Sequence, residues 1–273
     1  MQMKRLTLTR RPLRTPLNLM RAGMPSADVI MDVRPVVSAR GKQFHILRTT
    51  EVDDYETTPT ANALRKALSG KNVPSVSALT AALKAKPAGD NFAGTARKAA
   101  KLSIASGPSE TFNDVKALIA SLVPDDQMIA HNPKIKTTAT SGRVKEENRN
   151  VKVKAFLYAA SREDDNDFHL IVGRRPTQLP EMYITMELSG LPPANSPALG
   201  NLTTARDAFK TFFGSDLPGT SYDFYDPPIP VTITGSLFFD MTHSSGQRPG
   251  PPSLKSRMPT IWEVHPLTSM VLG

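Results

Sequence analysis

Apolar and β-branched residues dominate two stretches near the N-terminus, at residues 28–39 and 42–50. Both are rich in Val, Ile, Phe and Thr, which is typical of β-strands. Arg40 and Gly41 separate them and suit a tight turn. The pattern therefore predicts a β-hairpin, whose second strand is ended by an acidic run made of Glu51, Asp53, Asp54 and Glu56.

Residues 60–123 are rich in Ala, Leu and Lys, which are the strongest helix formers. Cap residues and Gly or Pro stops divide this region into four short helices, which we expect at 60–69, 75–86, 92–106 and 110–123. The fourth carries a one-sided apolar stripe of Phe112, Val115, Leu118, Ile119 and Leu122. We expect a small helical layer whose stripes face the core rather than a partner.

The C-terminal half predicts five strands and one helix. The strands are expected at 151–160, 168–173, 182–190, 230–240 and 260–267, and the helix at 203–214. The order β-β-β-α-β-β is that of a five-stranded OB-type barrel, although it also suits a small α+β sheet. Gly235 in the middle of a strand favours the barrel, because barrel strands bend at glycines or bulges.

These patterns predict an α+β protein of two domains. Residues 1–27 form a basic N-terminal arm, 28–139 an α+β domain with the hairpin and four short helices, and 140–273 an OB-like β-barrel domain with its helix between strands three and four. The boundary lies within a polar, turn-rich segment, residues 125–148.

Four ordered blocks in the C-terminal half carry a resemblance: DDNDFHLIVG (164–173), MELSGLPPAN (186–195), VTITGSLFFDMTH (231–243) and WEVHPL (262–267). Together they resemble an OB-type barrel domain of bacterial proteins, over about residues 143–270. The resemblance implies a fold but no assigned activity. One departure is the loop after His243, residues 244–259, which is longer and more basic than in that group. Residues 1–139 resemble no family.

Composition narrows the function classes. The chain has no cysteine, which excludes disulfides, thiolate metal sites and a cysteine nucleophile. No apolar run approaches the ~20 residues that span a bilayer. Arg10 and Arg11 form a pair like that of an export signal, but Pro12 and Arg14 interrupt the apolar stretch that such a signal requires. We expect a cytoplasmic protein.

The positive charge is concentrated in one half of the chain. The net charge is +9, and residues 1–139 hold 21 Lys and Arg against 11 Asp and Glu, whereas residues 140–273 hold 13 against 14. Any contact with nucleic acid or an acidic surface is therefore predicted for the N-terminal half. The candidate contact residues are Arg10, Arg11, Arg14, Lys98 and Lys101. The alternative is a solvated tail and lysines that serve solubility.

Carboxylates and imidazoles supply the candidate chemistry. The strand ends carry Asp167, His169, Glu187, Asp240, His243, Glu263 and His265. Asp240, His243, Glu263 and His265 are the candidate metal ligands, since imidazole and carboxylate oxygen suit zinc or a similar ion. Their spacing matches no recognised metal signature. The alternatives are hydrogen bonds that orient turns, or acid–base catalysis.

We interpret the chain as a non-enzymatic binding module that contacts nucleic acid or an acidic surface through its basic N-terminal half. This interpretation assigns no catalytic residue and no cofactor, with a divalent metal left open. The first alternative is a metal-dependent hydrolase with a carboxylate and histidine site at one end of the barrel. The second is an assembly protein whose four helices dock on a partner. Nucleotide-binding glycine motifs and a nucleophile elbow are absent.

Overall fold

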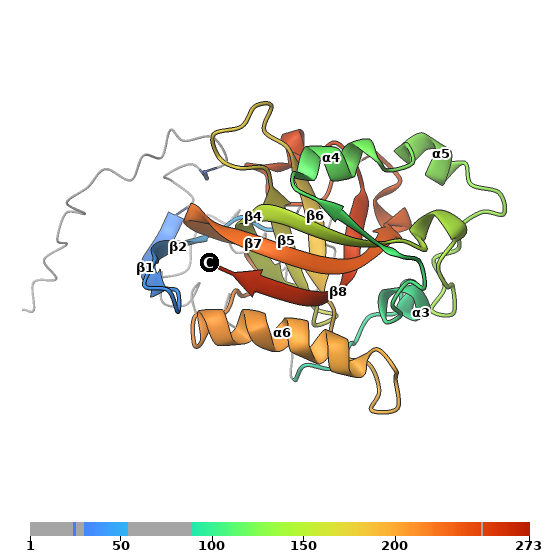
Figure 1. Cartoon of the computed structure of the whole chain (residues 1–273), viewed down its shortest axis with the longest axis horizontal. Coiled ribbons are helices and arrows are strands. Elements are labelled where there is room, and N and C mark those ends of the chain that lie inside the picture. Colours follow the sequence, from blue (N-terminus) through green and yellow to red (C-terminus); the bar gives the residue numbers. More distant parts are fainter. Residues whose placement is uncertain (1–23, 26–29, 54–88, 247) are drawn as a thin grey trace, which may run out of the picture.

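The structure is a computed structural model that describes residues 24–25, 30–53, 89–246 and 248–273 (Figure 1). Its strands are β1 (Ile30–Val37), β2 (Gln43–Thr49), β3 (Ser109–Phe112), β4 (Asn150–Arg162), β5 (Phe168–Gly173), β6 (Tyr183–Leu188), β7 (Asp223–Phe239) and β8 (Trp262–Leu272). Its α-helices are α3 (Lys98–Lys101), α4 (Val115–Ala120), α5 (Asp125–Ile129) and α6 (Leu199–Phe213). Short 3₁₀ turns are η2 (Lys145–Glu147), η3 (Met241–His243) and η4 (Lys255–Arg257).

All eight strands belong to one mixed sheet, in the order β1-β2-β7-β8-β6-β5-β4-β3 with an additional pairing between β7 and β4. The pairs β3–β4 and β6–β8 are parallel and the other pairs are antiparallel. The parallel pair β6–β8 joins segments that are far apart in the chain. This pairing places residues of the candidate site on neighbouring strands. Helix α6 covers one side of the sheet (Figure 1) and buries Leu202, Ala205, Phe209 and Phe213.

The predicted four-helix layer followed by a separate five-stranded barrel is wrong. All the strands of the described chain lie in one eight-stranded sheet, and the helices of this part are α6 and the three short helices α3 to α5. The predicted helices at 60–69 and 75–86 lie outside the described residues. The segment 92–106 yields only the four residues of α3.

The segment 109–112 forms β3 instead of the start of a helix, because its backbone pairs in parallel with β4. Its exposure alternates residue by residue, and Phe112 packs against the main core. The helix α4 begins only after Asp114, whose carboxylate accepts a hydrogen bond from the amide of Lys116. Pairing with a long buried strand thus outweighs helix propensity here.

The N-terminal hairpin is confirmed as β1 and β2. The turn is closed by a hydrogen bond from Gly41 N to Ser38 O, and Gly41 adopts the positive φ of 76° that favours glycine. Phe44 and Ile46 on β2 are fully buried in the core that the C-terminal strands also form, and β2 pairs with β7. The division into domains at residue 140 stays a prediction, while strands from both sides of it share this sheet and core.

The five predicted C-terminal strands and their helix are present as β4 to β8 and α6. Gly235 lies at an irregularity in the pairing of β7 with β8, where a Cβ atom would come within 2.6 Å of Pro266 O. The close approach at this glycine sets the path of β8 beside His265. None of the helices in the described ranges is long and apolar enough to cross a membrane.

A fully buried ion pair fixes the end of β7 next to α3. Arg97 donates to both carboxylate oxygens of Glu147, at 2.6 and 2.7 Å, and to the carbonyl of Phe239. Glu147 in turn accepts the amides of Phe239 and Val144. This network joins η2 to the segment that carries Lys101 and to the end of β7, which is followed by Asp240 and His243.

Asp223 is expected to give the folding stability a distinctive pH dependence. Burial raises the pKa of this carboxyl group to about 8, although Arg48 lies 3.6 Å away, and its ordinary value is 3.8. Between these values the folded state holds a proton that the unfolded state has lost, so stability falls as pH rises, by up to about 1.4 kcal/mol per pH unit. In Asp223→Asn this contribution is absent. Urea unfolding across this pH range should show a flatter profile for the variant; parallel profiles would contradict the assignment.

Candidate functional site

The residues singled out in the sequence blocks converge at one end of the central strands, and the register explains why. His169 on β5 lies directly opposite Glu187 on β6. Glu263 on β8 pairs with Thr185 on β6, so that His265, two residues further on, lies level with Glu187. Side chains two apart on a strand face the same side, which directs Glu263 and His265 toward the same region.

His265 is at the centre of the cluster and is fully buried. Its Nδ1 atom lies 2.6 Å from Glu187 Oε2 and 3.6 Å from Glu263 Oε2. Its Nε2 atom lies 3.5 Å from Asp167 Oδ2 and 2.6 Å from Ser189 Oγ. Three carboxylates from three different segments thus surround one imidazole.

Four buried polar atoms in this group have no hydrogen-bond partner of suitable geometry: Asp167 Oδ2, Glu187 Oε2, Glu263 Oε2 and His265 Nδ1. Buried polar atoms are almost always hydrogen-bonded, so four such atoms around one point require an explanation. Each of the four side chains is at most 4 % exposed. Bulk water therefore does not satisfy them.

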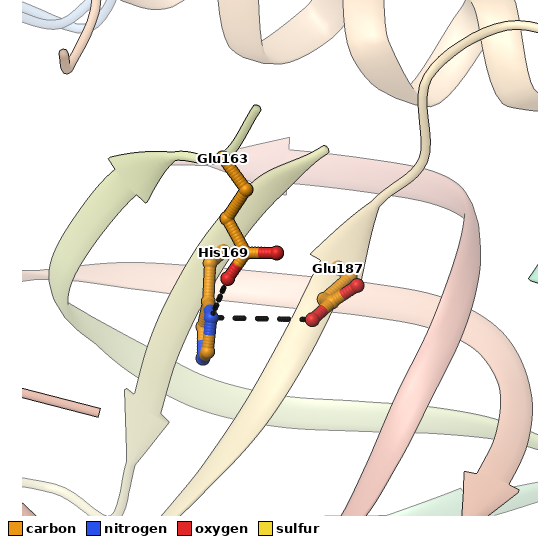
Figure 2. Close-up of side chains that lie close together, drawn as sticks. All are labelled: Glu163, His169 and Glu187. Atoms are coloured by element: carbon orange, nitrogen blue, oxygen red, sulfur yellow. Dashed lines mark hydrogen bonds and ion pairs between the residues drawn. The ribbon is translucent and has the colours of Figure 1, made fainter. Parts of the chain in front are cut away.

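A second group lies beside the first and shares Glu187 with it (Figure 2). His169 Nδ1 lies 2.5 Å from Glu163 Oε1 and 4.0 Å from Glu187 Oε1, and its Nε2 atom bonds with Thr185 Oγ1 at 3.2 Å. Glu163 follows β4 directly and its side chain is 22 % exposed. This group therefore extends from the buried residues of the cluster to Glu163, which is partly exposed at the surface.

A third group consists of Asp240, His243 and Glu263, whose ligand atoms lie within 4.8 Å of one another. Asp240 ends β7 and caps η3 by accepting the amide and the hydroxyl of Thr242. His243 Nδ1 is hydrogen-bonded to the other oxygen of Asp240. The side chains of Asp240 and His243 are 11 % and 13 % exposed, so this pair also lies at the rim.

Lys101 provides the cation among these carboxylates. Its Nζ atom lies 3.5 Å from Asp165 Oδ2, 3.7 Å from Asp167 Oδ2 and 3.8 Å from Glu187 Oε2. Although burial alone would lower the pKa of Lys101, Glu187 and the neighbouring carboxylates raise it well above its ordinary value. Lys101 is therefore a fixed positive charge inside the cluster.

The carboxylates divide into two kinds. Burial raises the pKa of Asp167 and of Glu263 well above the ordinary values. Burial acts in the same direction on Glu187, but His265 and Lys101 outweigh it and the pKa of Glu187 is well below its usual range. The pKa of Asp240 likewise falls to about 2, because its interactions with His243, Lys101 and Thr242 together outweigh burial.

Asp240, His243 and Glu263, predicted as ligands of one ion, do lie together. His265 is 3.6 Å from Glu263 and groups instead with Asp167 and Glu187. Sequence reasoning missed two members of the cluster. Glu163 lay in the acidic turn 162–167 with nothing to distinguish it, and Lys101 was interpreted as a surface contact.

The five residues predicted to contact nucleic acid or an acidic surface have different outcomes. Arg10, Arg11 and Arg14 lie outside the described residues. Lys98 is on α3 and lines a surface pocket. Lys101, by contrast, points into the acidic cluster and is engaged by three of its carboxylates.

Comparisons of the chain with protein-family models, with curated proteins and with solved structures give no match. The resemblance to OB-type domains therefore stays a prediction. The arrangement of side chains is the basis for the function proposed below.

Proposed function

We propose that the protein is a divalent-metal-dependent hydrolase whose ion is held on the floor of the cluster by Asp167, Glu187, Glu263 and His265. One observation carries the proposal: the buried Nδ1 atom of His265 lies 2.6 Å from Glu187 Oε2 and 3.6 Å from Glu263 Oε2, and no hydrogen bond of suitable geometry satisfies any of the three atoms. Lys101 supplies one positive charge to this group, and a divalent ion would satisfy the polar atoms that remain without a hydrogen bond.

The hydrogen bonds of Ser189 indicate the tautomer of His265. Ser189 Oγ donates to the carbonyl of Lys101, so it accepts from His265 Nε2. The proton of a neutral His265 is then on Nε2, and Nδ1 carries the lone pair. Metal-binding histidines usually donate their second N–H in this way, which fixes the ring and the tautomer.

The distances also suit a shared ion. Ligand bonds of about 2.0–2.2 Å place the donor atoms around one ion roughly 3–3.5 Å apart. His265 Nδ1 lies 3.6 Å from Glu263 Oε2, close to that separation, and 2.6 Å from Glu187 Oε2, so this pair would have to move apart slightly to share an ion. Carboxylate oxygens and one imidazole suit Zn²⁺ or Mn²⁺.

The rim of the cluster favours hydrolysis over a purely structural ion. A bound divalent ion lowers the pKa of its water and polarises a substrate carbonyl or phosphoryl oxygen. The pairs Asp240–His243 and Glu163–His169 lie next to the proposed ion and reach the surface. Such carboxylate-oriented imidazoles are suited to move a proton to or from a substrate.

Hydrolysis of p-nitrophenyl acetate and of bis-p-nitrophenyl phosphate by the Zn²⁺- or Mn²⁺-loaded chain tests the proposal. We expect turnover of one of these probes that EDTA abolishes. In His243→Gln turnover should fall by about 10²- to 10⁴-fold while the ion is retained. Turnover no greater than that of a metal-loaded Asp167→Asn variant would overturn the assignment as a hydrolase.

A further inference from the structure

A second charged feature lies on the outer face of β4. Lys152, Lys154 and Phe156 project to one side of this strand, while the residues between them, Val151, Val153 and Ala155, are buried. Side chains at every second position share a face. One side of β4 therefore presents two exposed lysines and a half-buried aromatic ring.

The neighbouring strands extend this face without adding acidic groups. Lys154 lies opposite Thr232 on β7, Phe156 lies opposite Pro230, and Thr232 lies opposite Val271 on β8. Val271 is among the few large apolar side chains of the described chain that are exposed, at 55 %. In Figure 1 these three strands cross the front of the molecule between α4 and α6.

The same face leads into a groove of about 420 Å³ that is lined by Arg40, Lys154, Phe156, Arg174 and Arg175 together with Asp114. Asp114 is the one acidic side chain of this lining, and it accepts three hydrogen bonds from Arg174 at 2.8–3.0 Å. Arg40 donates a hydrogen bond to Gly273 O at 3.2 Å, and no carboxylate side chain of the described residues pairs with Lys154 or Arg175. The groove therefore presents two positive charges without an acidic side chain as partner.

The aromatic ring indicates which anion the groove fits. The guanidinium of Arg175 lies over the ring of Phe156, 5.6 Å from its centre. Proteins that bind single strands combine a basic groove for the phosphates with aromatic and guanidinium groups on which bases stack. An acidic protein surface would use the charges but not the ring.

We propose that this face, centred on Lys154, Phe156 and Arg175, binds single-stranded nucleic acid. It is distinct from the metal cluster: β8 contributes Glu263 and His265 near its start and Val271 near its end, roughly 20 Å further along the strand. The inference is thus independent of the hydrolase assignment, and either one can fail without the other.

Fluorescence polarisation of the whole chain with a labelled oligothymidylate of about 15 nucleotides tests the inference, since such faces cover up to about 16. Lys154→Glu and Arg175→Glu should each weaken binding by about 10-fold or more and reduce the slope of log affinity against log salt by about 0.7. Phe156→Leu keeps an apolar side chain and should weaken binding by about 5- to 100-fold through lost stacking.

Two controls separate this face from other basic parts of the chain. Lys134→Glu makes the same charge change at an exposed position outside the groove and should leave binding within about 2-fold. A variant with Arg10, Arg11 and Arg14 changed to Ala tests the N-terminal arm. The inference is overturned if Lys134→Glu weakens binding as much as Lys154→Glu. It is equally overturned if only the arm variant loses affinity, or if polyglutamate displaces the oligonucleotide at equal concentration.

Discussion

A Glu187→Gln variant should lose more than about 100-fold in affinity for Zn²⁺ or Mn²⁺, because even outer partners of metal ligands cost about 10- to 100-fold. Glu187 is the central acid of the cluster: one oxygen lies 2.6 Å from His265 Nδ1, and the other lies 4.0 Å from His169 Nδ1. Glutamine keeps the shape of the side chain but removes the negative charge. Competition with a chromophoric chelator measures the change.

Glu181→Gln is the matched control for this experiment. Glu181 lies before β6 and pairs with Arg257, outside the three groups that form the cluster. It undergoes the same chemical change, so its metal affinity should equal that of the wild type. Thermal unfolding of both variants establishes that they are folded. Equal affinities in Glu187→Gln and Glu181→Gln would contradict the assigned ligand set.

Glu147→Gln is expected to lower the free energy of unfolding by about 3–5 kcal/mol, the usual cost of removing one partner of a buried ion pair. Arg97 and Glu147 are 1 % and 0 % exposed, and the pair also holds two backbone amides and the carbonyl of Phe239. Glutamine leaves the guanidinium buried without a counter-charge. Urea unfolding gives the difference.

The surface pair of Glu110 with Arg149 provides the comparison. This pair is also bidentate, at 2.7 and 2.8 Å, but its side chains are 39 % and 24 % exposed. Water screens it, so Glu110→Gln should cost no more than about 1 kcal/mol. Losses of the same size at Glu147 and Glu110 would show that burial does not set the strength of the first pair.

Strands β1, β2 and β4 to β8 and helix α6 could be predicted from the sequence, because their patterns agree with their tertiary environment. Residues 109–112 show where this fails: their neighbours favour helix, but pairing with β4 and burial of Phe112 decide for a strand. No local pattern reports a partner strand about 40 residues later in the chain. The same limit explains why the shared sheet was missed.

The sequence predicted most residues of the candidate site, but not which of them lie next to one another. His and carboxylate residues at strand ends identified most of the cluster. Which carboxylate meets which imidazole depends on the parallel pairing of β6 with β8, which joins residues 185–186 to 263–264. Lys101 was misjudged because lysine is usually exposed, whereas here a short helix places its ammonium group among acids.

Metal analysis of the whole 273-residue chain tests the central claim most directly. The protein is incubated with Zn²⁺, dialysed against buffer and analysed for zinc, alongside His265→Gln and Glu187→Gln. We predict about one tightly held ion per wild-type chain, as expected for a buried set of carboxylate and imidazole ligands, and none in either variant. A wild-type chain that retains no zinc, or variants that retain as much as the wild type, would contradict the proposed metal site.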